Sequence, residues 1–147
     1  MNEENARISK APWHLWVIGL LAILWYLNGL YDFASTTTKE ASYTSQFTQA
    51  MHNFYDAMPI WALAAWGAAE LFGIAAGILL LFKSKFALYA FGCALVAILV
   101  NLAYNFIVAD ASKAIGSNAI YFEAIVVAST LLFLAYSYRM SATDALS

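Results

Sequence analysis

Apolar residues in this chain are gathered in four long runs that are separated by more polar stretches. Each run is roughly 20 to 24 residues long, and about 20 apolar residues in a helix are enough to cross the hydrocarbon core of a bilayer, which is about 30 Å thick. The pattern therefore predicts four membrane-spanning helices, at residues 12–33, 59–82, 86–109 and 119–138.

The connections between these runs differ in length. Only Lys83, Ser84 and Lys85 separate the second run from the third, so these two helices are expected to be antiparallel neighbours. The segment 34–57 is longer, and its apolar residues recur at helical spacing: Tyr43, Phe47, Ala50, Met51 and Phe54. We expect an amphipathic helix here on the outer surface, for which the spacing of Thr37 and Glu40 is that of a capping box.

Composition supports a membrane protein with a single transmembrane domain over residues 1–147. The chain is 63% hydrophobic and 11% charged, whereas soluble domains are about 45–50% apolar and about 25% charged. The net charge of −2 argues against nucleic acid as a partner. The fold class expected is therefore all-α, an integral membrane four-helix bundle with the lipid bilayer as its surroundings.

Lysine and arginine predict the orientation of the bundle, because cytoplasmic loops are enriched in them. With both termini inside, the cytoplasmic side holds five of these residues: Arg7, Lys10, Lys83, Lys85 and Arg139. The outer side then holds two, Lys39 and Lys113. This bias favours an N-in, C-in arrangement, which leaves segment 34–57 in the first outer loop.

Glu70 is an acid in the middle of the second apolar run. Such a residue costs on the order of 3 kcal/mol on insertion, so we expect it to face protein rather than lipid. No cationic residue is near in the sequence, and we expect Glu70 to be protonated at rest.

Polar residues of the other runs also fall in their outer halves, whereas the inner halves are almost wholly apolar. This asymmetry predicts a polar pocket that opens outward, with Glu70 as its floor. Its walls are predicted to be Asn28, Trp66, Asn101, Tyr104 and Glu123. The alternative is that these side chains only join the helices by hydrogen bonds. We interpret Asp32, Asp56 and Asp110 as solvated helix ends.

Other chemistry has little support in the sequence. His14 and His52 are expected on opposite sides of the membrane, so they cannot both bind one haem. The chain has no signature of a zinc protease, a serine hydrolase, a P-loop or a dinucleotide site. We therefore predict no catalytic residue, no metal site and no cofactor, and an enzymatic activity is disfavoured.

Several short stretches resemble a family of small four-span proteins of the bacterial inner membrane, commonly labelled sugar transporters. The matching residues are Pro12-Trp13-His14-Leu15-Trp16, Gly29 with Asp32, Pro59 with Trp61, and Trp66-Gly67. The layout is also similar to that of DoxX-like four-helix membrane proteins. The resemblance implies a multi-pass protein of the bacterial inner membrane.

Three functions are compatible with these features. The leading hypothesis is binding or transport of a small molecule in the outward pocket, with a homodimer formed through the second helix, where Gly73 and Gly77 allow close approach. The first alternative is an accessory subunit of a larger membrane complex. The second is a DoxX-like redox protein linked to quinone.

Overall fold

The computed structural model describes residues 12–143 and 145–146, and these residues contain helices but no strand. Three long elements are α1 (His14–Thr37), α4 (Ile60–Leu81) and α7 (Asn118–Ala142). The fourth is α5 (Phe86–Ala103), which continues as a π-helix, η2 (Tyr104–Val108). The short helices are α2 (Ala41–Thr44), α3 (Gln49–Asp56) and α6 (Ala111–Ile115).

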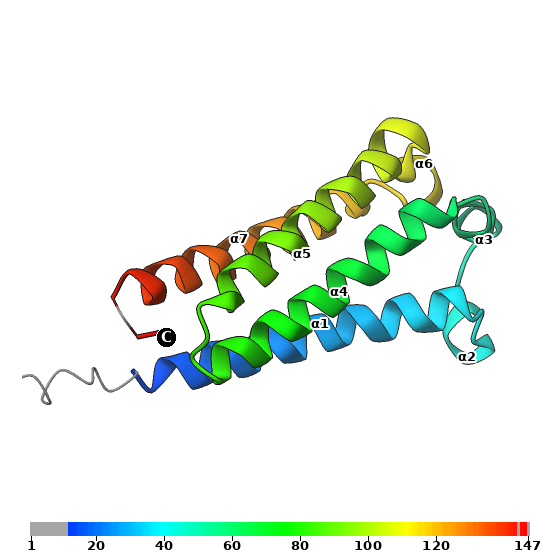
Figure 1. The fold of residues 1–147 in the computed structure, drawn as a ribbon. Coiled ribbons are helices and arrows are strands. Elements are labelled where there is room, and N and C mark those ends of the chain that lie inside the picture. Colours follow the sequence, from blue (N-terminus) through cyan, green and yellow to red (C-terminus); the bar gives the residue numbers. More distant parts are fainter. Residues whose placement is uncertain (1–11, 144, 147) are drawn as a thin grey trace, which may run out of the picture.

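The long helices form a bundle whose two ends differ (Figure 1). The short helices α2, α3 and α6 lie across one end, here called the α3 end. The turn between α4 and α5 and both described ends of the chain lie at the other, here called the terminal end. Helix α4 packs along both α1 and α5, and α5 packs along α7. The all-α four-helix bundle predicted from the apolar pattern is confirmed.

Each long helix is able to cross a membrane. The four spans contain 22 to 25 residues, which at about 1.5 Å per residue makes them longer than a hydrocarbon core of about 30 Å. Their outward faces carry large apolar side chains that water would not favour, among them Leu20, Leu24, Phe72, Val96 and Leu132. The chain is therefore a multi-pass membrane protein.

The ends of two spans differ from the sequence prediction. Helix α1 ends at Thr37 instead of residue 33, because hydroxyl groups prolong its last turn: Thr37 donates to the carbonyl of Phe33 and Thr38 to that of Ala34. Helix α7 continues to Ala142 instead of residue 138.

The helix expected in the first loop is found as two short helices, α2 and α3, with a break at residues 45–48, and the predicted capping box is wrong. Thr37 belongs to α1, and the Glu40 side chain accepts hydrogen bonds from Ser35 and Ser42 instead of capping a helix. The residue that caps α3 is Thr48, whose hydroxyl oxygen accepts from the backbone N–H of Met51. Serine and threonine oxygens commonly satisfy the free N–H groups of a first turn in this way.

Glycines bring α1 and α4 into close contact. A methyl group at Gly73 would collide with the Tyr26 ring, and one at Gly77 would lie 3.1 Å from the backbone oxygen of Gly19. The small residues of α4 therefore join two helices of one chain. The glycine face that was expected to meet a second copy is occupied by α1, and a dimer through another face stays a prediction.

The terminal half of the bundle is filled by an apolar core. Leu15, Leu80, Phe91 and Leu146 are almost fully buried in it, and the Phe91 ring stacks on Phe133 at 5.6 Å. This packing agrees with the apolar inner halves of the predicted spans. The core fills the bundle between Tyr26 and the terminal end.

Helices α1 and α7 form the fourth side of the bundle, and their backbones stay apart over most of their length. Side chains join them instead. The hydroxyl groups of Tyr26 and Thr130 are hydrogen bonded at 2.8 Å, and His14 Nδ1 meets the Tyr136 hydroxyl nearer the terminal end.

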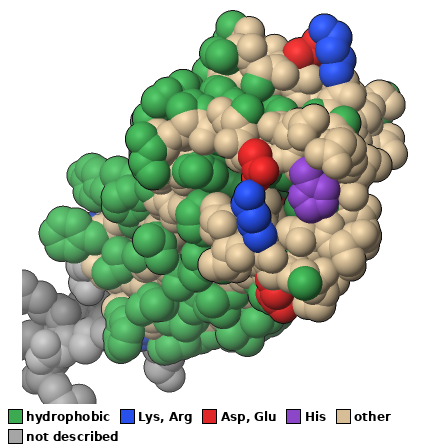
Figure 2. Space-filling view, turned by 90° about the vertical axis from the view of Figure 1, so that its right-hand side faces the viewer, with side chains coloured by type: hydrophobic (Ala, Val, Ile, Leu, Met, Phe, Trp, Pro, Cys, Tyr) green, Lys and Arg blue, Asp and Glu red, His purple; other side chains and the backbone are tan. Residues whose placement is uncertain are grey.

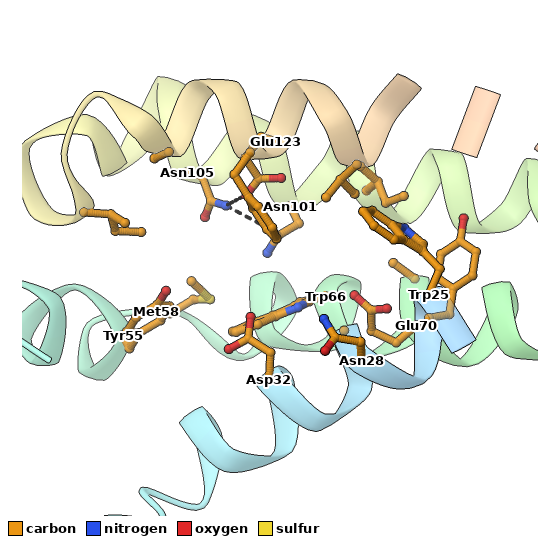
Figure 3. A pocket seen from close by; sticks show the side chains of 18 of the residues that line it. Trp25, Asn28, Asp32, Tyr55, Met58, Trp66, Glu70, Asn101, Asn105 and Glu123 are labelled. Atoms are coloured by element: carbon orange, nitrogen blue, oxygen red, sulfur yellow. Dashed lines mark hydrogen bonds between the residues drawn. The ribbon is translucent and has the colours of Figure 1, made fainter. Parts of the chain in front are cut away.

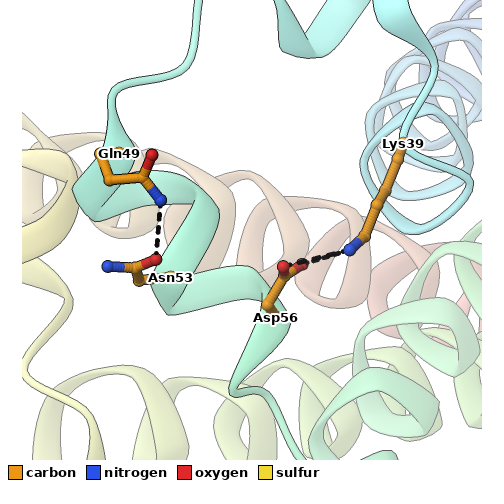
Figure 4. Close-up of polar contacts among 4 residues, drawn as sticks. All are labelled: Lys39, Gln49, Asn53 and Asp56. Atoms are coloured by element: carbon orange, nitrogen blue, oxygen red, sulfur yellow. Dashed lines mark hydrogen bonds and ion pairs between the residues drawn. The ribbon is translucent and has the colours of Figure 1, made fainter.

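The α3 end carries ion pairs and polar side chains. Lys39 after α1 pairs with Asp56 of α3 at 2.9 Å, and Gln49 donates to Asn53 along α3 (Figure 4). Figure 2 shows this end of the molecule, where a few charged side chains and a histidine lie beside a broad hydrophobic area. The exposed pair holds α3 close to the end of α1, although such pairs stabilise a fold by at most about 1 kcal/mol.

Candidate functional site

A cavity of about 330 Å³ lies inside the half of the bundle nearer the α3 end (Figure 3). All four long helices contribute to its wall, together with α3 and α6. Its polar lining residues are Asn28, Asp32, Tyr55, Glu70, Asn101, Asn105, Asn118 and Glu123, and its largest aromatic ones are Trp25, Tyr26, Trp66 and Phe122. Pockets that bind small organic ligands begin at about this size.

Five of the six predicted site residues line this single cavity: Glu70, Asn28, Trp66, Asn101 and Glu123. They come from α1, α4, α5 and α7, so the fold brings together side chains up to 95 positions apart in the chain. Glu70 lies halfway along α4, at the depth that the sequence predicted. Whether these residues bind a ligand is a prediction that their placement alone does not test.

The sixth predicted residue, Tyr104, does not line the cavity. Its ring packs against Phe54 and Trp61, and its hydroxyl donates to the carbonyl of Ala57 at 3.3 Å. Asn105 lines the cavity instead, because the next position on the helix turns away from α3 and towards α7. Tyr104 therefore holds the α3 end of the bundle together.

Glu70 is held where α4 meets α1. Its carboxyl group lies against Gly29, so that a Cβ at residue 29 would lie 2.7 Å from Oε1 and closer still to Oε2. Only a glycine at residue 29 leaves room for the Glu70 carboxyl group at this distance from α1. The Trp66 indole lies next to the carboxyl on the other side, one turn earlier on α4 (Figure 3).

A hydrogen-bonded chain of amides forms the wall opposite Glu70 (Figure 3). Asn101 Nδ2 donates to the carbonyl of Ala62 at 3.1 Å. Asn105 Nδ2 donates both to Asn101 Oδ1 at 3.0 Å and to Glu123 Oε1 at 3.3 Å. Since both partners of this nitrogen are acceptors, the orientation of the Asn105 amide is fixed.

The other end of the Asn105 amide has no partner. Its Oδ1 is buried and accepts no hydrogen bond from the described part of the chain, and the residue as a whole is 6% exposed. An unsatisfied buried acceptor costs about 1–3 kcal/mol. Asn105, a residue of the cavity wall, therefore has an acceptor that the described part of the chain leaves without a partner.

Asp32 is a wall residue that the sequence interpretation missed. It was interpreted as a solvated helix end, but it lines the cavity and accepts hydrogen bonds from Tyr43 at 2.6 Å and from Thr36 at 3.3 Å. Burial and the hydrogen bond to Asp32 raise the pKa of Tyr43 above its ordinary value. The phenol therefore stays protonated and fixes the carboxylate. Helical spacing from Asn28 to Asp32 was the available signal.

Aromatic rings form the wall on the side of α3. The Tyr55 ring stacks on Trp66 at 6.0 Å between centroids, and Phe33 meets the edge of Trp66 at 5.2 Å. Burial, together with the negative charges of Asp32 and Glu123, raises the pKa of Tyr55 to about 12. Tyr55 is therefore a neutral phenol on the cavity wall.

The charges of the lining residues all have one sign. Asp32, Glu70 and Glu123 line the cavity, and no lysine, arginine or histidine among the described residues does so. The acids surround the space instead of converging on a point, and within residues 12–143 and 145–146 no cluster suited to a metal ion is found. This arrangement can attract a positively charged group larger than a metal ion.

Comparison with protein-family models, with curated proteins and with solved structures found no match for this chain. Its function is therefore inferred from the cavity itself.

Proposed function

We propose that this chain is a membrane protein that binds a small organic molecule in the cavity between its four long helices, as a binding protein or as part of a transport cycle. The observation that supports the proposal most is the lining of this one cavity. The cavity has a volume of about 330 Å³, and its lining includes three acids, three asparagines of α1, α5 and η2, and two tryptophans. If these groups served only to join the helices, each would be expected to have a hydrogen-bond partner in the chain. Asn105 Oδ1 is buried and has no partner among the described residues.

The proposal also states which end of the bundle faces the cytoplasm and which membrane contains the protein. Lys83, Lys85 and Arg139 lie towards the terminal end, and Lys39 and Lys113 towards the α3 end. Since cytoplasmic segments favour basic residues, the terminal end faces the cytoplasm of a bacterial cell and the cavity is nearer the outer surface.

Cysteine labelling tests this orientation. Cys93 is exposed, so it is first replaced by serine. Labelling of Lys113→Cys, but not of Lys85→Cys, by an impermeant maleimide in whole cells would support this orientation, and the reverse pattern would refute it.

Native mass spectrometry of the protein purified in mild detergent tests the binding proposal. A retained small molecule that is absent from Glu70→Gln supports a ligand in this cavity. The matched control is Asp56→Asn, which removes an exposed acid at the α3 end and should leave the molecule bound. A wild-type chain that retains no small molecule, or a molecule that is still retained by Glu70→Gln, would refute the proposal.

The same spectra address the two alternatives. A stoichiometric protein partner would favour an accessory subunit of a larger complex, and a retained quinone would favour the redox protein. The mass of the intact assembly also tests whether the chain forms a homodimer.

A further inference from the structure

Carboxyl and amide oxygens, which accept hydrogen bonds, come into the cavity wall from all four long helices and from η2. Three of its groups are carboxyls, and the two amide nitrogens of the α5 and η2 wall already donate to protein oxygens. The Asn105 Oδ1 atom lies in the same wall, is buried, and has no donor among the described residues. A ligand that carries N–H or O–H groups is able to donate to the carboxyl and amide oxygens of this wall.

Charge narrows the class of ligand further. Asp32, Glu70 and Glu123 approach the space from α1, α4 and α7 without a basic side chain beside it among the described residues. A cationic ligand would favour the ionised form of these acids and replace the proton expected on Glu70 at rest, whereas a neutral ligand would leave that proton in place. The acids do not form a cluster that a metal ion could occupy in the described part of the chain.

The remaining wall is apolar and aromatic. Trp25, Trp66 and Phe122 present large ring surfaces, and Ile98 and Val126 fill the space between them. Aromatic faces attract cations within about 6 Å of the ring centre and also pack against apolar groups.

We propose that the cavity binds an organic cation whose charged group carries N–H donors, such as a protonated primary amine, on an aromatic or apolar body. The ammonium group lies between Glu70 and the Asn105 and Glu123 wall, and the body packs against the tryptophans. This inference rests on the proposed binding function and specifies the chemical class of its ligand.

Four probes that share one body test the proposal on the full chain in detergent. They are 2-phenylethylammonium, its N-trimethyl derivative, 2-phenylethanol and phenylacetate, each titrated at pH 7 by calorimetry and by tryptophan fluorescence. We expect the primary ammonium to bind at least tenfold more tightly than the alcohol, because only the former carries the charge. The trimethyl cation should bind with intermediate affinity, since it lacks N–H donors, and phenylacetate should not bind.

Variants then assign the binding to this cavity. Glu70→Gln should weaken binding of the ammonium at least tenfold, and the control Asp56→Asn should bind within twofold of wild type. If Glu70→Gln does not fold, Glu123→Gln and Asp32→Asn serve the same purpose from two other helices. Asn105→Leu should reduce the preference for the primary ammonium over its trimethyl derivative, because it removes the unpartnered oxygen.

Three results would overturn the inference. They are equal affinity for the alcohol and the ammonium, binding of D-glucose in preference to both, and no binding of either cation. A neutral molecule retained by wild type and lost from Glu70→Gln in mass spectrometry would keep the proposed binding function and refute the cationic ligand.

Discussion

The carboxyl group of Glu70 on α4 lies directly against Gly29 on α1, and no side chain fits at residue 29 unless that carboxyl moves. Gly29→Ala should therefore displace Glu70 without unfolding the bundle, since the atoms in the way are the far end of a flexible side chain. Alanine also favours a helix by up to about 1 kcal/mol over glycine. We expect retention of a ligand to fall while the free energy of unfolding changes by less than about 1 kcal/mol, as measured by native mass spectrometry and by denaturation in detergent.

Gly92 supplies the matched control for this change. It is also a helical glycine, and a methyl group there would meet nothing within 4 Å. Gly92→Ala should leave ligand retention unaltered. If Gly29→Ala binds as wild type does, the position of the Glu70 carboxyl is not important for binding.

Gly73→Ala should be more damaging to stability than either of these changes. The added methyl group would meet the Tyr26 ring, which is 1% exposed and is held by its hydrogen bond to Thr130. Since the ring also packs against Phe91 and Phe133, overpacking should cost about 1–3 kcal/mol. Equilibrium unfolding of the purified protein would measure the loss, and a stability equal to that of Gly92→Ala would contradict the tight contact between α1 and α4.

The hydrogen bond between Tyr26 and Thr130 should couple α1 to α7. In a double-mutant cycle of Tyr26→Phe and Thr130→Val, we expect a coupling energy of about 0.6 kcal/mol and at most about 1.7 kcal/mol. The cycle is needed because the Thr130 hydroxyl also donates to the carbonyl of Val126 within α7, and the single variant removes that bond as well. Strictly additive effects would show that the side-chain bond between the helices does not contribute.

The pKa of the Glu40 carboxyl group should lie below its ordinary value. Hydrogen bonds from the hydroxyls of Ser42 and Ser35, at 2.8 Å and 3.0 Å, lower the pKa of its carboxyl. Ser42→Ala should raise that pKa more than Ser35→Ala does, because the bond from Ser42 has the larger effect. An NMR titration of the labelled carboxyl carbon measures both changes.

The sign of the linked stability follows from this depressed pKa. The contribution of Glu40 to folding is fully present above the pKa of the unfolded chain and is lost as the pH falls through the pKa of the folded one. Acid should therefore loosen the junction of α1 and α2, and Ser42→Ala should reduce that acid effect. An unchanged titration in both serine variants would contradict the hydrogen bonds.

Length and polarity were enough to predict the four spans and the half of the bundle that holds polar side chains. A helix long enough to span a membrane needs about 20 apolar residues, and this constraint is visible in any single sequence. The placement of Glu70 in one cavity with Asn101 and Glu123 also followed, since an acid halfway along a span must face other helices.

Other features depended on contacts that no local pattern contains. Tyr104 was predicted in the wall, but its neighbour Asn105 lies there instead, because α5 meets α4 on one side and α7 on the other. The exposed end of a helix and the wall of a cavity look alike in sequence, so the sequence did not show that Asp32 lines the cavity and accepts a hydrogen bond from Tyr43. The partner of Gly73 was likewise a helix of the same chain, although spacing alone suggests a second copy equally well.

The separation between the backbones of α1 and α7 has a mechanical consequence. Three sides of the bundle are held by packing along whole helices, and the fourth is held by pairs such as Tyr26 with Thr130 and His14 with Tyr136. Separating α7 from α1 would break few bonds, whereas separating α4 from α1 or α5 would break packing along the helices. The side between α1 and α7 is therefore where the bundle should resist mechanical strain least.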